Sequence, residues 1–187
     1  MHIQKWFQLR NFFDDDKVDQ IIQLTKQAQM NRGGVIIDGK SVMRRLGRNC
    51  MSGWIHQTDD NVWIFAEILK AVEEINKRTL KFDLEGCSIE PLQYLEYGPF
   101  QFYNEHVDNG ADQVSTRKYS VSLQLSDSKD YWGGNLQIKG DGQSPYAPRE
   151  RGSMAIFPSH LQHIARPVWY GKRKVIVAWI RGKTPLS

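Results

Sequence analysis

The sequence predicts a mainly β protein, a sandwich or barrel with a layer of N-terminal helices packed on one sheet. From Leu92 onward, short strand-like runs follow one another at regular spacing with turn residues between them, which is typical of this class. Helical patterns occur only in the first half of the chain. These helices are too few and too early for alternating βαβ units, so a parallel sheet with crossover helices is not expected.

Two helices are expected, over Asp14–Gln29 and over Asn61–Thr79. Acidic residues begin the first helix, where they favour an N-terminus, and apolar residues follow at helical spacing. The second helix follows a pair of aspartates that can cap it. Its apolar face consists of Val62, Phe65, Ile68, Leu69, Val72 and Ile75. Between the helices, Asn31–Asp60 is basic and dotted with glycine, and we expect a loop there with a short strand at Val35–Asp38.

The second half of the chain contains the expected strands. Glycine, proline and aspartate clusters separate these runs, which are rich in β-branched and aromatic residues. The expected strands are Leu92–Tyr97, Phe102–Val107, Tyr119–Leu125, Asn135–Lys139, Ser153–Phe157, His163–Trp169 and Lys174–Ile180.

Composition excludes several classes of protein. The 187 residues are 40% hydrophobic, which suits a single globular domain with a core. No apolar run approaches the roughly 20 residues of a spanning helix, and the N-terminus lacks the apolar stretch of a signal peptide. We therefore expect a cytoplasmic protein, neither membrane-bound nor secreted. Cys50 and Cys87 match no zinc or redox motif, and we expect two buried thiols.

The net charge of +4 is mildly basic. Two groups of basic residues contribute most visibly, and nucleic-acid binders usually carry a stronger excess on one face. We therefore interpret these groups as solvated surface. They are Arg44, Arg45 and Arg48, and Lys172, Arg173 and Lys174.

His106 and Asp108 form a His-x-Asp pair at the end of an expected strand. Residues i and i+2 of a strand point to the same face, so these two side chains can bind one ion, whereas on a helix they would diverge. A single pair is a weak signal, because a histidine hydrogen-bonded to an aspartate near a turn has the same pattern. A second histidine on another strand would strengthen it.

His160 and His163 are the candidates for that second histidine. Two histidines and one carboxylate form the facial triad of non-haem Fe(II) oxygenases, which leaves positions open for a cosubstrate and O2. We expect His163 to be the ligand, because it begins a strand. His160 would flank the site or lie in an exposed turn.

Arg173 lies ten residues after His163, across the turn at Tyr170-Gly171-Lys172. Strand alternation places Arg173 with Val175 and Val177 on one face and its lysine neighbours on the other. An arginine inside a barrel requires an anionic partner, and a guanidinium matches a carboxylate with two hydrogen bonds. The distal carboxylate of 2-oxoglutarate would be that partner. The alternative is an exposed arginine in a basic run.

These parts together resemble the Fe(II)/2-oxoglutarate dioxygenases of the prolyl 4-hydroxylase type, over Leu92–Arg181. They occur in the order of that family, with its ten-residue gap between the second histidine and the basic residue. The matching parts are Tyr97-Gly98, Tyr103, His106-x-Asp108, Asp130-Tyr131-Trp132-Gly133-Gly134-Asn135-Leu136, Gly152, Phe157-Pro158, His163-x-x-x-Pro167-Val168, Gly171-x-Arg173 and Trp179.

The resemblance implies a double-stranded β-helix, a jelly-roll or cupin-like barrel, at residues 86–187. Residues 1–85 would form a helical support region with loops, and the whole chain 1–187 would be one dioxygenase domain. The cofactors implied are Fe(II), 2-oxoglutarate as cosubstrate and O2, with ascorbate as a reductant. The iron ligands implied are His106, Asp108 and His163, and Arg173 would bind the distal carboxylate of 2-oxoglutarate.

Other positions agree less completely with the family. Tyr97 and Tyr103 match tyrosines near the cosubstrate, although either could be an ordinary aromatic residue of the core. Gln124 stands where the oxygen-sensing branch has a cosubstrate-binding tyrosine, so the second polar contact to 2-oxoglutarate has no assigned residue. Arg173 matches bacterial relatives and that branch, whereas collagen-type enzymes usually carry lysine. Asn135 replaces the commoner glutamate, which we interpret as a surface change.

The activity implied is hydroxylation of a C–H bond with release of succinate and CO2, and a prolyl residue of a peptide or protein is the leading substrate. The expected loop Arg44–Asp60, with Trp54 and His56, would lie over the barrel mouth and hold an extended peptide or an anionic small molecule. The alternative is a structural loop in which Trp54 fills the core.

Three other functions are weighed against this one. A free amino-acid or small-metabolite hydroxylase would use the same scaffold. A nucleic-acid demethylase usually has a second arginine six residues after the first, where this chain has Trp179. A non-catalytic jelly-roll binding module, with zinc or without a metal, would not need the complete set of His106, Asp108, His163 and Arg173.

Overall fold

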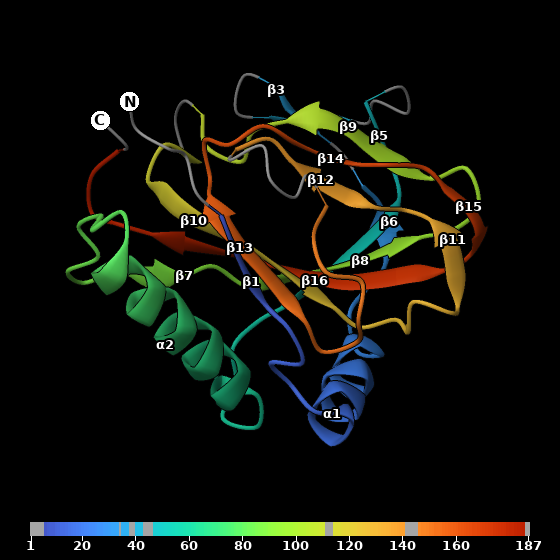
Figure 1. The fold of residues 1–187 in the computed structure, drawn as a ribbon, viewed down its shortest axis with the longest axis horizontal. Helices are drawn as coiled ribbons and strands as arrows, with labels where there is room; N and C mark the ends of the chain where they lie inside the picture. The colour runs from blue at the N-terminus through green and yellow to red at the C-terminus, as the bar shows by residue number, and fades with distance from the viewer. Residues whose placement is uncertain are drawn as a thin grey trace.

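The computed structural model describes residues 6–33, 35–37, 40–42, 47–110, 114–140 and 146–185. Within these ranges the chain forms two helices and a series of mostly short strands (Figure 1). In chain order they are β1 (Phe7–Leu9), α1 (Asp15–Thr25), β2 (Asn31–Arg32), β3 (Val35–Ile37), β4 (Lys40–Val42), β5 (Arg48–Asn49), β6 (Met51–Ile55), α2 (Val62–Arg78), β7 (Ser88–Ile89), β8 (Leu92–Tyr97), β9 (Phe102–His106), β10 (Arg117–Gln124), β11 (Tyr131–Gly133), β12 (Leu136–Ile138), β13 (Met154–Pro158), β14 (His163–Ala165), β15 (Val168–Gly171) and β16 (Arg173–Arg181).

Two antiparallel sheets face each other, as expected for a jelly roll. The larger sheet has the strand order β1-β13-β10-β16-β8-β6-β2, with β7 also paired to β16. The smaller sheet has the order β12-β14-β9-β5, and β11 pairs with β15 alone. Figure 1 shows the smaller sheet on one side of the larger sheet and both helices on the other. The predicted fold class is therefore confirmed.

Alternate residues of the central strands β10 and β16 face opposite sides of the larger sheet. One set packs with α1 and α2 in the main hydrophobic core, and it comprises Tyr119, Val121, Leu123, Ile176, Ala178 and Ile180. The other set, which includes Ser120, Gln124, Arg173, Val175 and Trp179, faces the smaller sheet. The larger sheet thus separates an apolar helical core from a more polar interior between the two sheets.

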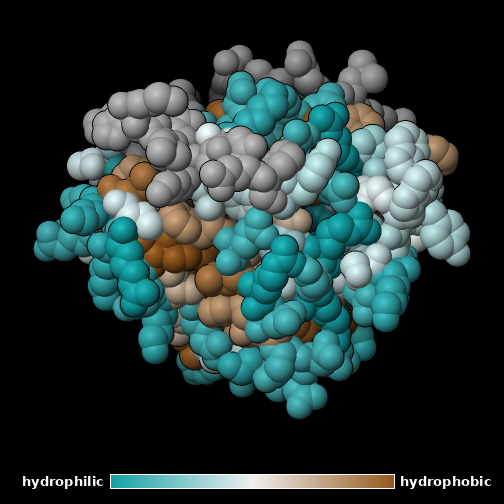
Figure 2. Space-filling model, viewed as in Figure 1, coloured by the Kyte–Doolittle hydropathy of each residue, from teal (hydrophilic) through white to brown (hydrophobic). Residues whose placement is uncertain are grey.

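Both helices pack an apolar stripe on the larger sheet. Asp14 caps α1 by accepting a hydrogen bond from the backbone N–H of Lys17 at 2.9 Å, which satisfies one of the unpaired amides of the first turn. The buried apolar residues of the helices are Val18, Ile21, Ile64, Phe65, Ile68 and Val72. In Figure 2 the outer surface of the helical layer is largely hydrophilic, and hydrophobic residues are visible between the helices and the sheet. Neither helix has the length and apolar character needed to traverse a bilayer, in the part of the chain that the structure describes.

The expected loop over Asn31–Asp60 was wrong for its second half. Met51–Ile55 forms β6, which pairs with β8 along its whole length. Gly53 suggested a loop, but this glycine permits a close approach: a Cβ there would lie 2.8 Å from the Met30 sulfur and 2.9 Å from the Ala28 Cβ. Trp54 does not fill the core, because it is 44% exposed.

Other sequence expectations need smaller corrections. The single strand expected over His163–Trp169 is divided into β14 and β15 around Pro167, which cannot donate a backbone hydrogen bond to a ladder. Cys50 is buried as expected, but Cys87 is only partly buried. The short strand expected at Val35–Asp38 is found as β3, although Asp38 lies outside the described residues, as do Arg44 and Arg45.

Gly152, before β13, lies against the segment that leads into α1. Its φ is +76°, and a Cβ at this position would overlap the backbone oxygen of Phe13. The Phe13 amide also donates to the Gly152 carbonyl at 3.0 Å, so the two segments cannot easily separate. We expect Gly152→Ala to lower the free energy of unfolding by at least about 3 kcal/mol, from backbone strain and the overlap.

Urea denaturation monitored by circular dichroism measures this effect. Gly98→Ala is the matched control, because the nearest atom to an added Cβ there is 3.7 Å away, in ordinary contact. Equal stability of the two variants would contradict the expectation.

Candidate active site

His106, Asp108 and His163, called the triad below, come together between the two sheets. His106 ends β9 and His163 begins β14, and the two are directly paired across these strands. One potential ligand atom from each triad residue lies within 4.8 Å of the others. The Nε2 atoms of His106 and His163 are 3.5 and 3.4 Å from the two carboxylate oxygens of Asp108. Three donor atoms therefore converge on one point, in the pattern that the strand alternation predicts.

Backbone contacts orient both imidazole rings toward that point. Nδ1 of His106 is 2.7 Å from the backbone oxygen of Asn104, and Nδ1 of His163 is 2.9 Å from that of Leu161. A carbonyl can only accept, so each Nδ1 carries a proton, and in the neutral ring the lone pair is then on Nε2. This is the tautomer that a metal ligand requires, and the contact is the one that commonly orients ligating histidines.

The carboxylate of Asp108 is held ionised within the protein. Burial favours its neutral form, but the adjacent His163 and His106 and a 2.7 Å hydrogen bond from the Ser120 hydroxyl together lower the pKa of Asp108 well below its usual range. Ser120 is in turn 3.0 Å from the hydroxyl of Ser159. Burial lowers the pKa of His163 and so favours the neutral imidazole, although the charge of Asp108 acts in the opposite direction.

Of the two candidates for the second histidine, the structure brings only His163 into the triad. His160 lies in the turn after β13 and is exposed, which is the second of the two positions predicted for it. His163 is buried and also packs edge-on against Phe157, with ring centroids 4.7 Å apart.

Arg173 is 5% exposed and lies inside the barrel, directly opposite Tyr97 on β8. Its Nε donates to the Gln124 side-chain oxygen at 3.2 Å, and its guanidinium carbon lies 5.7 Å from the centre of the Tyr97 ring. No carboxylate among the described residues lies within ion-pair distance of Arg173. A buried guanidinium of this kind is costly without an anion, so the position suits a ligand carboxylate.

Tyr97 and Tyr103 both lie near these groups, in different ways. Tyr97 is buried beside Arg173 in the cluster between the sheets. Tyr103 stacks on the ring of His106 with centroids 3.5 Å apart. Burial raises the pKa of Tyr103 to about 12, so its hydroxyl stays protonated. Tyr103 is therefore placed against a triad ligand, whereas Tyr97 is placed against Arg173.

Sequence comparison agrees with this geometry. Residues 92–181 match a family model described as the 2OG-Fe(II) oxygenase superfamily, and this stretch contains the triad and Arg173. Residues 92–181 therefore form a domain of this superfamily. Its members are 2-oxoglutarate-dependent dioxygenases that use Fe(II), 2-oxoglutarate and O2.

Several curated PKHD-type hydroxylases are similar to about half of this chain. A PKHD-type hydroxylase of Crocosphaera subtropica is 34% identical over 104 residues, which are 54% of this chain and 46% of that protein. This chain spans about half the length of several curated relatives that it matches.

Solved structures of the superfamily share the fold. A Pseudomonas putida prolyl-4-hydroxylase has a TM-score of 0.75 at 22% identity, covering 96% of this chain and 94% of its own. A Trichoplax adhaerens prolyl hydroxylase, in complex with a hypoxia inducible factor peptide fragment, has a TM-score of 0.77 at 16% identity, covering 95% and 84%. At these identities the likeness extends to the fold alone.

The residues present fit the two groups that the superfamily uses. Two imidazoles and one carboxylate, all buried or half-buried, are the donor set of a non-haem Fe(II) site. The buried guanidinium of Arg173 has no carboxylate partner in the described part of the chain, which suits the distal carboxylate of 2-oxoglutarate.

Sequence reasoning missed the role of Arg48. We interpreted it as solvated surface, but it is buried: its guanidinium donates to Cys50 Sγ at 3.2 Å and to Gln93 Oε1 at 3.1 Å. Its guanidinium carbon also lies 4.7 Å from the centre of the Tyr103 ring. The cause is the short pairing of β5 with β9, which places Arg48 opposite Tyr103. A two-residue strand leaves no periodic signal in a sequence.

Sequence reasoning also missed the contact between Arg117 and Trp179. Arg117 forms a two-pronged ion pair with Glu90, at 2.8 and 2.6 Å, and its guanidinium carbon lies 3.9 Å from the centre of the Trp179 ring. It also donates to the backbone oxygen of Asp108 at 3.3 Å. Trp179 lies opposite Ser120 in the sheet, and the Trp54 ring is 6.1 Å from its own. Arg117 therefore connects the ring of Trp179 to the backbone of the triad residue Asp108.

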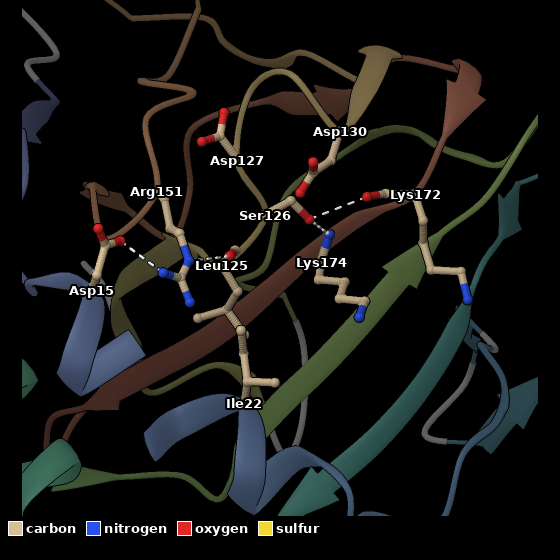
Figure 3. A pocket seen from close by; sticks show the side chains of 9 residues that line it. All are labelled: Asp15, Ile22, Leu125, Ser126, Asp127, Asp130, Arg151, Lys172 and Lys174. Carbon is tan, nitrogen blue, oxygen red and sulfur yellow. Dashed lines mark hydrogen bonds and ion pairs between the residues drawn. The ribbon is translucent and has the colours of Figure 1, made fainter. Parts of the chain in front are cut away.

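A separate hollow of about 600 Å³ lies between α1 and the ends of β10 and β16 (Figure 3). Arg151 is already paired with Asp15 and Asp19, and Lys172 is paired with Glu96. The residues that line it are Asp15, Ile22, Leu125, Ser126, Asp127, Asp130, Arg151, Lys172 and Lys174. None of them belongs to the triad, and the hollow is not the site of the chemistry.

Proposed function

We propose that this protein is an Fe(II)/2-oxoglutarate-dependent hydroxylase whose substrate is a prolyl residue in a peptide or protein. One observation carries the catalytic part: the triad converges in the barrel interior, and the same interior holds a buried arginine that has no carboxylate partner among the residues described. The likeness to solved prolyl hydroxylases supports the choice of substrate. Cytoplasmic location and the use of ascorbate stay predictions from the sequence.

Each residue has a defined task in this proposal. His106, Asp108 and His163 would hold Fe(II), and Arg173 would hold the far end of 2-oxoglutarate. When bound, the iron and the cosubstrate supply the oxidising chemistry that places an oxygen atom from O2 on a substrate carbon. The protein favours the neutral imidazole of His163, keeps Asp108 ionised and excludes water with the packed residues around Arg173.

Trp179 provides the observation that favours a peptide. Its side chain is 6% exposed, and its indole N–H has no hydrogen-bond acceptor among the described residues. A buried donor without an acceptor is costly, so the position suits a ligand that brings one. A backbone carbonyl next to the reacting proline would be such an acceptor. Trp54, exposed and adjacent, offers further apolar contact to an extended chain.

Incubation of the protein with Fe(II), 2-oxoglutarate and a library of proline-containing peptides tests the proposal. We expect succinate formation and a mass gain of one oxygen on a proline, with no reaction of free proline. Trp179→Phe keeps an aromatic side chain, although a smaller one, and removes the N–H, so we expect the KM for the peptide to rise about tenfold with unchanged 2-oxoglutarate affinity. Trp169→Phe, at an exposed position on β15, is the matched control.

The outcomes separate the alternatives. Oxidation of a free amino acid or metabolite in place of peptides would move the substrate to the small-molecule class. Failure to turn over 2-oxoglutarate with any substrate, together with failure to bind Fe(II), would favour a binding module. An unchanged peptide KM in Trp179→Phe would remove Trp179 from the substrate site.

A further inference from the structure

The side chain of Gln124 connects Arg173 to Tyr131. Gln124 is fully buried, and its amide makes three hydrogen bonds. Its oxygen accepts from Arg173 Nε at 3.2 Å, and its nitrogen donates to the Tyr131 hydroxyl at 3.2 Å and to the Ser126 carbonyl at 3.3 Å. A guanidinium can only donate and a carbonyl can only accept, so the orientation of the amide is unambiguous.

This orientation determines what the Tyr131 hydroxyl can do. The hydroxyl oxygen already accepts the N–H of Gln124, so its own proton points to another acceptor. No described residue provides one. Tyr131 is buried in the same cluster as Tyr97, Val168 and Val175, so bulk water does not readily take that place.

Tyr131 and Arg173 lie side by side at Gly134. A Cβ at Gly134 would be 3.3 Å from Arg173 Cδ and 3.4 Å from Tyr131 Cδ2, so this glycine touches both side chains. Arg149 holds Tyr131 from the other side: its guanidinium carbon lies 4.3 Å from the ring centre, and it donates to the Tyr131 carbonyl at 3.0 Å. The phenol is therefore fixed in place next to the guanidinium.

We propose that the Tyr131 hydroxyl is the second donor to the distal carboxylate of 2-oxoglutarate, and that Gln124 is the positioning residue that aims both Tyr131 and Arg173. Because Gln124 occupies the Nε of Arg173, the terminal nitrogens of the guanidinium remain to bind the carboxylate, and Tyr131 adds an O–H donor. This inference rests on the proposed function. It makes the site selective for 2-oxo acids that carry a second carboxylate.

Binding titrations test the inference without turnover. The anaerobic Fe(II) protein is titrated with 2-oxoglutarate and, separately, with 2-oxobutanoate, which lacks the distal carboxylate, and the metal-to-ligand absorption band is recorded. We expect Tyr131→Phe to weaken 2-oxoglutarate binding about tenfold and to leave 2-oxobutanoate binding unchanged. In this variant the amide nitrogen of Gln124 keeps its bond to Ser126 and loses only the one to Tyr131.

Gln124→Leu and Tyr170→Phe complete the design. Gln124→Leu removes the bonds to both Arg173 and Tyr131. We expect it to weaken 2-oxoglutarate binding more than Tyr131→Phe does, again with 2-oxobutanoate binding unaffected. Tyr170 is exposed on β15, and its change to phenylalanine should alter neither affinity.

Unchanged 2-oxoglutarate binding in Tyr131→Phe would overturn the inference and leave the proposed function intact. Equal weakening for both oxo acids would also overturn it, because it would indicate general damage to the site. If the native protein gave no band with either acid, the proposed function would fall, and the inference with it.

Discussion

His106→Ala is expected to reduce 2-oxoglutarate turnover by at least about a thousandfold, because only one imidazole and one carboxylate would remain to hold the metal. His106 contributes one of three converging donors and is held in the correct tautomer by the backbone of Asn104. The His106 ring also stacks on Tyr103, so the variant loses this stacking contact as well as a metal ligand. Succinate formation and iron content after gel filtration are the two measurements.

His160→Ala is the matched control for this experiment. It removes the same side chain a few residues from His163, but from an exposed turn outside the triad. We expect native turnover and native iron content in this variant. Native iron content and turnover in His106→Ala would exclude His106 from the ligand set.

Arg173→Ala is expected to weaken 2-oxoglutarate binding about a hundredfold. Two charge-assisted hydrogen bonds to a buried carboxylate are together worth on the order of 3 kcal/mol, which is two powers of ten in affinity. Iron affinity should change little, because Arg173 contacts none of the triad residues and its bonded partners are Gln124 and the Tyr97 ring. The KM for 2-oxoglutarate and an anaerobic titration measure the effect.

Arg173→Lys distinguishes charge from geometry. Lysine retains the positive charge but cannot form the two-pronged contact, and it loses the Nε bond to Gln124, so we expect an intermediate loss of about tenfold. An Arg173→Ala protein with native affinity for 2-oxoglutarate would assign the distal carboxylate to another cation, of which Arg48 is the buried candidate.

Those parts of the site that depend on strand alternation could be predicted from the sequence. The convergence of His106 and Asp108 is expected from a strand that runs through both residues, and it is found although β9 ends at His106. The inward direction of Arg173, with its lysine neighbours outside, needs only the local period of a strand. The fold class followed from the same regularity, since short strands at even spacing leave few arrangements.

Features that depend on contacts between distant segments could not be predicted in this way. Arg48 is buried because β5 pairs with β9, and nothing local to Arg48 distinguishes it from the basic residues near it in the sequence. Gly53 suggests a turn in the sequence, but in the structure it makes room for Met30. The bond between Gln124 and Tyr131 spans a turn whose geometry the sequence does not define.

One face of the larger sheet packs in the helical core, and the other faces the interior between the two sheets, called the chamber below. This arrangement limits how the chain can change over evolution. Along β10 and β16, consecutive residues serve folding and chemistry in turn, so a substitution at one position affects mainly one of the two properties. A one-residue insertion or deletion is different, because it exchanges the faces of every residue beyond it. It would move Arg173 or Ser120 into the apolar core and an isoleucine or valine into the chamber. Point substitution can therefore tune this protein gradually, whereas length changes are confined to the turns that join its strands.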